Sequence, residues 1–217
     1  TRDMMHHAVH WVLHYHRDAH RYAEQQRQGK WKSIPYPEAA ERRVGIMGLG
    51  ALGGAAARAL SDLGFTVAGW ANNPKSIDDV EVFLGADGLI PFLQRTDILV
   101  SLLPLTPATE GLINRTTLAH LPKGAFFINA GRGASVIDED LIEALDSGHI
   151  ARVSLDVFHT EPLPADNPYW NHPKVDLTPH VASHTTPRTA GREVAEDIRL
   201  VAAGKKPRNL VKLDQGY

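Results

Sequence analysis

The sequence predicts an α/β protein built on a Rossmann-type, doubly wound parallel sheet. From residue 43 onward, short apolar runs alternate with amphipathic helical stretches, the pattern of βαβ units whose helices cover both faces of a sheet. The first apolar run, 44–47, breaks into a Gly-x-Gly-x-x-Gly turn at 48–53 and leads into an alanine-rich helix. A chain of 217 residues has room for one such domain, or for one domain and part of another.

The expected elements follow from apolar periodicity and from Pro and Gly positions. A helix over 4–27 precedes a Pro-containing connector at 30–40. The expected strands are 43–47, 65–70, 97–102, 125–129, 151–155 and 175–178. The expected helices are 51–63, 76–83, 88–95, 138–147 and 187–203, with helical turns at 109–120 and a Pro-rich loop at 160–174.

Composition and charge exclude several classes of protein. Apolar residues make up 43% and charged residues 22%, as in ordinary soluble globular proteins. The net charge of -2 predicts no basic surface, so we expect no nucleic-acid partner. The lack of cysteine excludes a disulfide scaffold, a thiolate nucleophile and a cysteine-ligated zinc. No apolar run is long enough to span a membrane and the first residues lack a signal-peptide core, so we expect a cytoplasmic protein without a membrane partner.

The glycine-rich turn has the features of a dinucleotide site. Gly48 permits the tight turn, Gly50 lets a pyrophosphate approach the backbone, and Gly53 lets the helix pack against the sheet. The helix N-terminus then offers free N–H groups and a positive dipole end to phosphate. A tight strand–helix turn in some other α/β protein is the alternative that the turn alone leaves open.

The segment after the second expected strand indicates which dinucleotide binds. An acidic residue about 20 positions after the turn would hold the adenosine ribose, but 71–75 reads Ala-Asn-Asn-Pro-Lys. A carboxylate here would repel a 2′-phosphate. Its absence, together with Lys75, favours NADP over NAD, and Asn72 and Asn73 can donate hydrogen bonds to either form.

Three downstream residues are candidates for catalysis. Arg132 and His180 each follow an expected strand, and Glu161 lies in a Pro-flanked loop. Taken singly, these would be an ordinary loop arginine, a structural histidine and a solvated carboxylate. Gly131 and Gly133 beside Arg132 indicate a close approach of backbone instead. Together the three supply a cation, a carboxylate and an imidazole, enough to polarise a carbonyl and move a proton.

Two other chemistries receive less support. His6, His10 and His14 have helical i, i+4, i+8 spacing, but no Asp, Glu or Cys completes that face, so we expect a surface or interface helix and no metal. A Ser-His-Asp hydrolase would need a Gly-x-Ser-x-Gly elbow, which the sequence does not contain.

The motifs in order resemble the D-2-hydroxyacid dehydrogenase family. They are the glycine turn, Leu-Pro-Leu-Thr-Pro-Ala-Thr at 103–109, Asn-Ala-Gly-Arg-Gly at 129–133, Leu-Asp-Val-Phe at 155–158 with Glu-Pro-Leu-Pro at 161–164, and Thr-Pro-His-Val-Ala-Ser at 178–183. The resemblance covers nearly the whole chain. Within the family it is nearest the glyoxylate/hydroxypyruvate reductase A branch, through Trp70, the stretch 162–173 and the terminal Gly216-Tyr217.

The resemblance implies roles for individual residues. Arg132 would bind the carboxylate and carbonyl oxygens of a 2-oxoacid, His180 would be the acid in reduction and the base in oxidation, and Glu161 would hydrogen-bond its imidazole. Asp156 would contact the nicotinamide side of the cofactor. The remaining expected cofactor contacts are Ala51 and Leu52 at the pyrophosphate, with Leu103, Pro104, Thr109, Ala130, Gly131 and Ser183.

The resemblance also implies a domain organisation. Residues 1–30 would be a dimerisation helix leading into the cofactor domain, 31–186 the NAD(P)-binding domain, and 187–217 a C-terminal helix and tail left from the substrate domain. Most of the substrate domain would be absent, because family members carry a long segment before the glycine turn. The expected function is NAD(P)H-dependent reduction of a small 2-oxoacid of the glyoxylate/hydroxypyruvate class to the D-2-hydroxyacid, in a homodimer. The alternative is a non-catalytic dinucleotide-binding module that acts through protein contacts.

Overall fold

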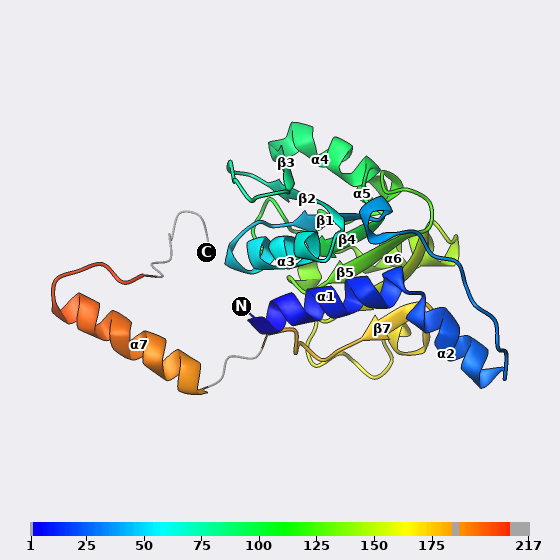
Figure 1. Cartoon of the computed structure of the whole chain (residues 1–217). Helices are drawn as coiled ribbons and strands as arrows, with labels where there is room; N and C mark the ends of the chain where they lie inside the picture. The colour runs from blue at the N-terminus through cyan, green and yellow to red at the C-terminus, as the bar shows by residue number, and fades with distance from the viewer. Residues whose placement is uncertain (1, 184–186, 209–217) are drawn as a thin grey trace. The chain divides into compact units, whose positions relative to one another are not determined.

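The computed structural model describes residues 2–183 and 187–208 and divides the chain into two compact units, Thr1–Ala182 and Ser183–Tyr217. The first unit is built around a seven-stranded sheet in the order β3-β2-β1-β4-β5-β6-β7, and all its described strand pairs are parallel (Figure 1). Its strands are β1 (Arg43–Met47), β2 (Thr66–Ala71), β3 (Glu81–Leu84), β4 (Ile98–Ser101), β5 (Ala125–Asn129), β6 (Ile150–Leu155) and β7 (Val175–Leu177).

The strand order reverses direction between β1 and β4. The chain moves outward from β1 through β2 to β3, then returns to the other side of β1 and continues from β4 to β7. In open parallel sheets ligands bind beside the carboxyl ends of the strands at such a reversal. This arrangement confirms the predicted doubly wound sheet and places the glycine-rich turn at the reversal.

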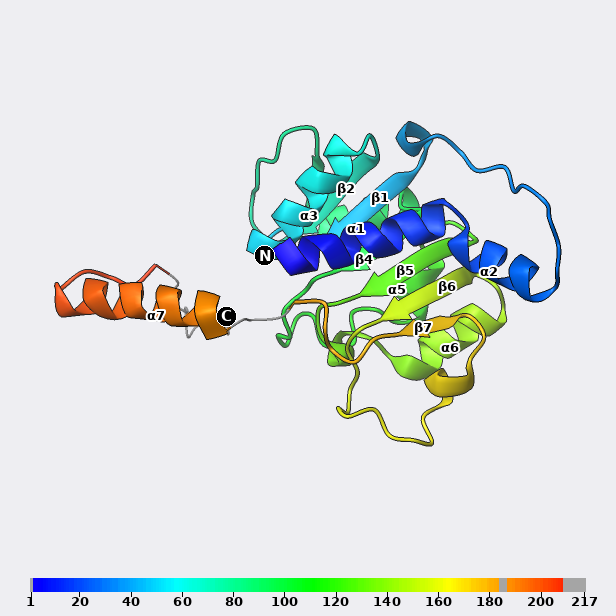
Figure 2. The ribbon, with the colours of Figure 1, turned by 60° about the horizontal axis from the view of Figure 1, so that its bottom comes forward.

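Helices cover both faces of the sheet, each over its own apolar core. On one face lie α1 (Arg2–His16) and α3 (Ala51–Asp62), which run side by side (Figure 2). The other face packs against α4 (Gly85–Gln94), α5 (Arg115–Ala119) and α6 (Asp138–Asp146). The strands are buried on both sides, which explains why they read as continuous apolar runs in the sequence.

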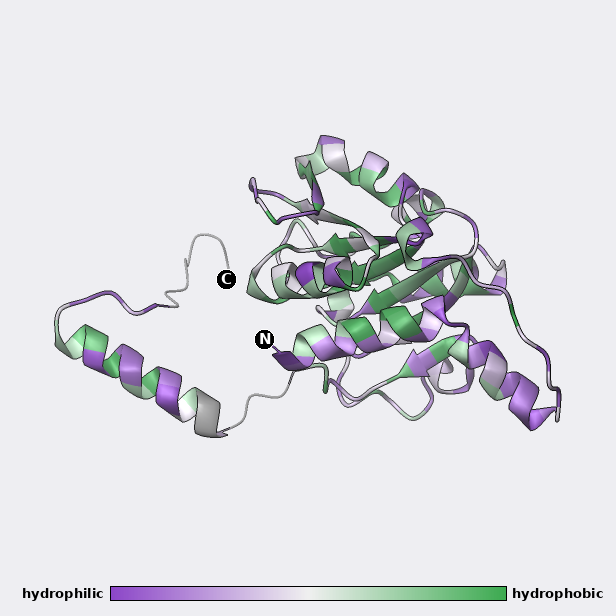
Figure 3. Ribbon diagram, in the orientation of Figure 1, coloured by the Kyte–Doolittle hydropathy of each residue, from purple (hydrophilic) through white to green (hydrophobic). Residues whose placement is uncertain are grey.

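The predicted single helix over 4–27 is wrong, because the chain breaks into α1 and α2 (Ala19–Arg27) at Asp18. Asp18 has a left-handed backbone, with φ of 53°, a conformation that a short polar side chain tolerates. The sequence has neither Pro nor Gly at this point to announce the break. α1 contributes buried residues to the core, whereas α2 contributes none, and Figure 3 shows it mostly hydrophilic.

The predicted helix over 76–83 is also wrong, since residues 81–84 form the edge strand β3. They pair with β2 from Ala68 to Ala71, and Val82 and Phe83 are β-formers that pack partly buried on this edge. The helix expected at 88–95 begins earlier, as α4 at Gly85. Tertiary pairing has therefore overridden a weak local pattern.

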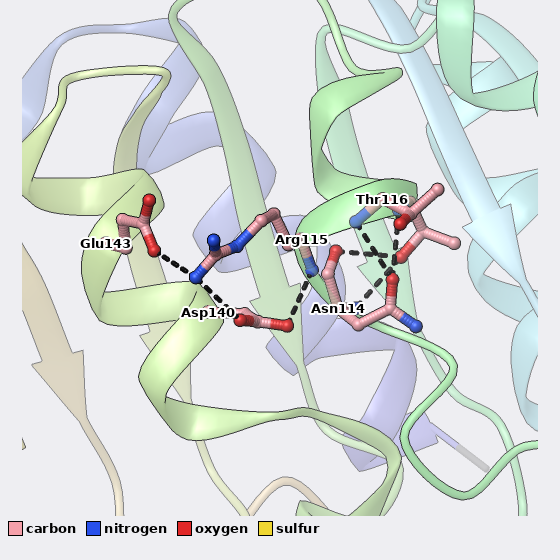
Figure 4. A network of polar contacts seen from close by, with 6 residues as sticks. Asn114, Arg115, Thr116, Asp140 and Glu143 are labelled. Atoms are coloured by element: carbon pink, nitrogen blue, oxygen red, sulfur yellow. Dashed lines mark hydrogen bonds and ion pairs between the residues drawn. The ribbon is translucent and has the colours of Figure 1, made fainter.

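The segment after β5 is tied firmly to the turn before α5. Gly111 N–H donates to Ala134 O at 2.9 Å, Ile113 N–H to Ser135 O at 2.9 Å, and Ile137 N–H to Ile113 O at 2.8 Å. The short helix η2 (Gly133–Ser135) lies within this segment. At the same place Asn114 caps α5, and Arg115 reaches across to Asp140 and Glu143 of α6 (Figure 4). We call residues 133–138 the anchored segment.

Two 3-10 helices complete the first unit, η1 (Ala39–Glu41) before β1 and η3 (Pro168–Asn171) before β7. The second unit contains α7 (Pro187–Ala202), which corresponds to the predicted helix over 187–203 and leaves Val194, Ile198 and Val201 exposed. Gly216 and Tyr217, used in the sequence comparison above, lie outside the described residues. Among the helices described, none combines the length and the apolar character needed to cross a bilayer.

Acid should weaken the docking of the first two helices. His20 stacks on His14 at 5.9 Å and meets Phe126 edge-on, and burial followed by the charge of Arg152 lowers its pKa from 6.5 to about 4. Between these two values the unfolded chain binds more protons than the folded one. The contribution of neutral His20 to the free energy of unfolding is therefore complete above about pH 6.5 and is lost as the pH falls toward 4.

We expect the thermal midpoint of unfolding to fall over that pH range. The variant His20→Phe keeps an aromatic ring against Phe126 but cannot titrate, so its midpoint should fall less. His6→Phe, at an exposed position of α1, is the matched control and should behave as the wild type does. An identical pH dependence in wild type and His20→Phe would contradict the assignment.

Candidate active site

Two glycines of the predicted turn are required by close backbone contacts. Gly48 has φ of 93°, and a Cβ atom there would lie 2.9 Å from Leu102 O. A Cβ at Gly53 would lie 1.9 Å from Gly48 O, a distance that no side chain can occupy. These contacts close the turn and bring α3 against β1, as the sequence pattern predicts.

Gly50 differs from these two, because a Cβ there would meet nothing within 4 Å. It is the N-cap of α3, and the first helical bond runs from Gly54 N–H to Gly50 O at 2.8 Å. The N–H groups of Ala51, Leu52 and Gly53 therefore precede the helical hydrogen-bond ladder. Open space before a bare backbone and a helix N-terminus fits a pyrophosphate, so the residues present suit a dinucleotide.

The end of β2 provides the residues predicted for the adenosine end. Asn72, Asn73 and Lys75 are all exposed in the loop that follows Ala71. Trp70 is buried in the core, and its indole N–H donates to Gly85 O at 2.8 Å, so it belongs to the packed interior rather than to a binding surface. The exposed Lys75, with no carboxylate between 71 and 75, fits a cofactor that carries a 2′-phosphate.

The loop after β4 is shaped from within by Thr109. Its buried hydroxyl donates to Pro104 O at 2.6 Å and accepts from Thr106 N–H at 2.8 Å. Leu103 is buried in the core. Thr109 therefore holds Pro104 in place, and a direct contact between Thr109 or Leu103 and a cofactor stays a prediction.

Arg132 extends from a braced turn after β5. The Asn129 side chain accepts from Gly131 N–H at 3.1 Å and donates to Arg132 O at 3.2 Å. The Arg132 side chain is exposed, and its Nη1 donates to Gly131 O at 2.7 Å. Asn129 belongs to the motif at 129–133, but the motif alone predicts no role for it. Its function as a brace depends on the turn geometry, which the motif alone does not reveal.

Gly131 and Gly133 bring the turn of Arg132 against two other loops. A Cβ at Gly131 would lie 2.7 Å from Leu103 O, and a Cβ at Gly133 would lie 1.9 Å from the carbonyl carbon of Phe158. The loops after β4, β5 and β6 therefore touch through their backbones. This confirms the close approach predicted from the two glycines.

Glu161 and His180 form a hydrogen-bonded pair. His180 Nδ1 lies 2.7 Å from Glu161 Oε2, while Glu161 Oε1 accepts from Phe158 N–H at 2.9 Å. The His180 side chain is 50% exposed and that of Glu161 35%, so the pair faces outward. Because an ionised Glu161 only accepts, Nδ1 carries the proton and Nε2 is the ring nitrogen left for a substrate.

The surroundings of Glu161 favour its ionised form. Partial burial acts to raise its pKa, but the hydrogen bonds from His180 and from Phe158 N–H outweigh burial, and the positive charge of Arg132 adds to them. The pKa of Glu161 therefore lies below its ordinary value. Arg132, Glu161 and His180 follow the parallel strands β5, β6 and β7 in turn, so all three predicted residues lie at the carboxyl end of the sheet.

Asp156 holds the loop that carries His180. Its side chain is 0% exposed, and its carboxylate accepts from the Thr178 hydroxyl, from Val181 N–H and from Ala182 N–H. His180 N–H donates to Asp156 O at 2.8 Å, and His180 itself has a left-handed φ of 54°. Both carboxylate oxygens thus accept hydrogen bonds from residues 178–182. The contact of Asp156 with nicotinamide stays a prediction.

The other predicted site residues lie as follows. Ala130 is buried and packs with Met4 and Ala182, so the first turn of α1 lies behind the site. Ser183 is exposed and belongs to the second unit, so its predicted role is untested. Across the residues the structure describes, no group of three or more His, Asp or Glu side chains could hold a metal ion.

The fold agrees with what comparison with known proteins finds. Residues 9–182 match the family model described as the NAD-binding domain of D-isomer specific 2-hydroxyacid dehydrogenases. Glyoxylate/hydroxypyruvate reductase A of Serratia proteamaculans (strain 568) is 40% identical over 217 residues, which are 100% of this chain and 69% of that protein. The protein of the same name from Klebsiella pneumoniae (strain 342) is 41% identical over 216 residues, again 100% of this chain and 69% of the relative.

Solved structures of similar proteins contain nicotinamide cofactors. A D-isomer specific 2-hydroxyacid dehydrogenase from Xanthobacter autotrophicus Py2, in complex with NADPH and MES, superposes with a TM-score of 0.97 at 46% identity, over 100% of this chain and 89% of that one. An NADPH-dependent glyoxylate/hydroxypyruvate reductase from Sinorhizobium meliloti, in complex with NADP and sulfate, gives a TM-score of 0.97 at 40% identity, over 100% and 70% of the two chains.

Gly53 and Gly50 of the glycine turn give a matched pair of variants. Gly53→Ala places a methyl group against Gly48 O, so we expect a loss of about 3 kcal/mol in the free energy of unfolding, at the upper end of overpacking costs. Gly50→Ala adds the same methyl to open space at an ordinary φ of -71°, so only the poorer N-cap of α3 should cost stability, by about 1 kcal/mol at most. Urea unfolding of both variants without cofactor measures the difference, and equal stabilities would contradict the packing argument.

Proposed function

Because the chain belongs to the D-isomer specific 2-hydroxyacid dehydrogenase family, we propose that it reduces a small 2-oxoacid of the glyoxylate or hydroxypyruvate class to the D-2-hydroxyacid. The observation that carries the proposal is the His180–Glu161 pair at the carboxyl end of the sheet, where the turn of Arg132 and the glycine turn also lie. A module that only bound a dinucleotide would have no need of an oriented imidazole, a carboxylate and a guanidinium together.

NADP is the preferred cofactor, with NAD as the alternative. Gly48, Gly50 and Gly53 would hold the pyrophosphate against the N-terminus of α3, and Asn72 and Lys75 would receive the adenosine end. Relatives that superpose closely were solved with NADPH or NADP. When bound, the reduced nicotinamide supplies the hydride that the reaction requires.

Arg132 binds and orients the 2-oxoacid. Its planar guanidinium can donate two parallel hydrogen bonds to a carboxylate, and its positive charge stabilises the negative charge that develops on the carbonyl oxygen. The hydrogen bonds of Asn129 fix the backbone of the turn from which this side chain extends. Lysine, with a single ammonium group, could not donate this pair of parallel hydrogen bonds.

His180 delivers the proton that completes the reduction. Glu161 accepts from Nδ1, which fixes the ring orientation and stabilises the protonated imidazole, so Nε2–H can donate to the carbonyl oxygen. In the reverse direction the neutral Nε2 accepts that proton from the hydroxyl group. Because Glu161 stays ionised below its ordinary pKa, the support for His180 persists into mildly acidic solution.

The domain boundaries form part of the proposal. We assign residues 31–186 to cofactor binding, 1–30 to dimerisation, and 187–217 to a C-terminal helix and tail associated with a substrate domain. The curated relatives match over about 69% of their own length, so they contain residues without a counterpart in this chain. Substrate residues that lie in those additional parts would set the choice among 2-oxoacids.

Turnover tests the function, and one variant tests the assignment of His180. We expect oxidation of NADPH, followed at its absorbance, with glyoxylate or hydroxypyruvate. His180→Ala should lower kcat by roughly 100-fold or more, the usual contribution of a general acid, while the Kd for NADPH stays unchanged. His120→Ala, at a partly buried position at the end of α5, is the control and should keep wild-type activity. No turnover with any of a panel of 2-oxoacids would refute the enzyme proposal.

A second copy of this chain is the partner that we propose for the segment from α2 to residue 38. Trp31 is 103% exposed, Tyr22 and Tyr36 are exposed beside it in sequence, and α2 has no buried residue. Large exposed aromatic residues are typical of interface anchors. Sedimentation should give the mass of a dimer, shifted toward monomer in Trp31→Ser but not in Ile90→Ser, an exposed apolar control on α4. A monomeric wild type would overturn the assignment.

A further inference from the structure

The Glu161 carboxylate lies on the long loop that connects β6 with β7. The loop leaves the sheet after Leu155 and returns at Val175 through η3 (Figure 2). Glu161 is partly exposed, and its two hydrogen bonds go to His180 and to nearby Phe158. Catalytic groups must keep their separation to a fraction of an ångström, so something must fix this loop relative to Arg132.

The anchored segment 133–138, which follows Arg132 directly, offers a rigid support. Its three backbone hydrogen bonds to the 111–113 turn, described above, fix it independently of the β6–β7 loop. The Ser135 hydroxyl also donates to Arg132 O at 2.7 Å, so Arg132 and this segment are held as one piece. Any group fastened to residues 133–138 is therefore fastened to Arg132.

His159 fastens the loop two residues before Glu161. Its Nε2 lies 2.7 Å from Val136 O, and because a carbonyl only accepts, Nε2 must carry the proton in this contact. The backbone of Phe158 lies against Gly133, so closely that a Cβ at Gly133 would be 1.9 Å from it. A backbone contact and a directional hydrogen bond thus act at the same place.

Tyr169 fastens the loop again on the far side of Glu161. Its ring is 2% exposed, and its hydroxyl donates to Asp138 Oδ1 at 3.0 Å. Burial, followed by the charge of Asp138, raises the pKa of Tyr169, so the phenol keeps its proton and remains a donor. Asn167 orders the approach to Tyr169, because its side chain accepts from Tyr169 N–H at 2.9 Å.

We propose that His159 and Tyr169 are positioning residues that hold the loop bearing Glu161 onto the anchored segment, and so set the distance from Glu161 and His180 to Arg132. One contact precedes Glu161 in the chain and the other follows it, and both end on residues 133–138. The assignment rests on the proposed function for its catalytic meaning, but the two contacts themselves do not depend on it. Neither side chain touches the reacting atoms in this role.

The test replaces His159 in two ways. His159→Leu removes the hydrogen bond to Val136 O, whereas His159→Gln can place an amide donor at the position of Nε2. We expect His159→Leu to lower kcat for 2-oxoacid reduction roughly tenfold, with the Kd for NADPH and the thermal midpoint close to wild type. His159→Gln should recover most of kcat, and His120→Leu, the control at the end of α5, should have no effect. Tyr169→Phe should lower kcat in the same direction while keeping the ring.

A second measurement separates this inference from the proposed function. Carbon-13 NMR titration of the Glu161 carboxyl group should show a pKa below its ordinary value in wild type and in His159→Gln, since the hydrogen bonds from His180 and Phe158 remain. In His159→Leu the pKa should move back toward the ordinary value, because the loop shifts. Absence of wild-type turnover with a shifted Glu161 titration in His159→Leu would refute the function and support the positioning role. Unchanged kcat and titration in His159→Leu would overturn the positioning role.

Discussion

The burial of the Asp156 carboxylate is the constraint on which the arrangement of the site depends. A carboxylate taken out of water is costly unless its oxygens are hydrogen-bonded, and here all of the compensating donors come from residues 178–182. The chain after β7 must therefore turn back over the end of β6. This turn places His180 in a left-handed conformation that a histidine would not adopt without such support.

Close backbone contacts between loops also fix the arrangement of the site. The segments after β4, β5 and β6 approach one another at Gly131 and Gly133, where a single additional carbon atom would collide with main-chain atoms. Each of the three segments carries or supports one part of the site. The contacts therefore hold these parts at fixed positions relative to one another. Main-chain contacts of this kind cannot relax as a flexible side chain can, which suits groups that must keep a fixed separation.

The sequence predicts the parts of this arrangement that have local signals. The glycine turn, the alternation of strands and helices, and the contacts of Gly131 and Gly133 all follow from residue type and spacing. The break at Asp18 and the edge strand β3 do not, because a left-handed aspartate and a pairing with β2 leave no distinctive local pattern. The clamp by Asp156 and the contact from His159 to Val136 O join residues more than 20 positions apart, so they become visible only when the chain is folded.

The hydrogen bonds of Glu161 also support the substrate-binding role that we propose for Arg132. One carboxylate oxygen accepts from His180 and the other from Phe158 N–H, so each already has a hydrogen-bond donor that is not Arg132. Within the described parts of the chain Arg132 makes no ion pair, and its guanidinium donates only to the carbonyl of Gly131. If Glu161 and Arg132 were paired, an incoming carboxylate would first have to displace a charge-assisted contact. Glu161 instead pairs with the imidazole of His180. The guanidinium of Arg132 can then pair with the anionic substrate that we propose.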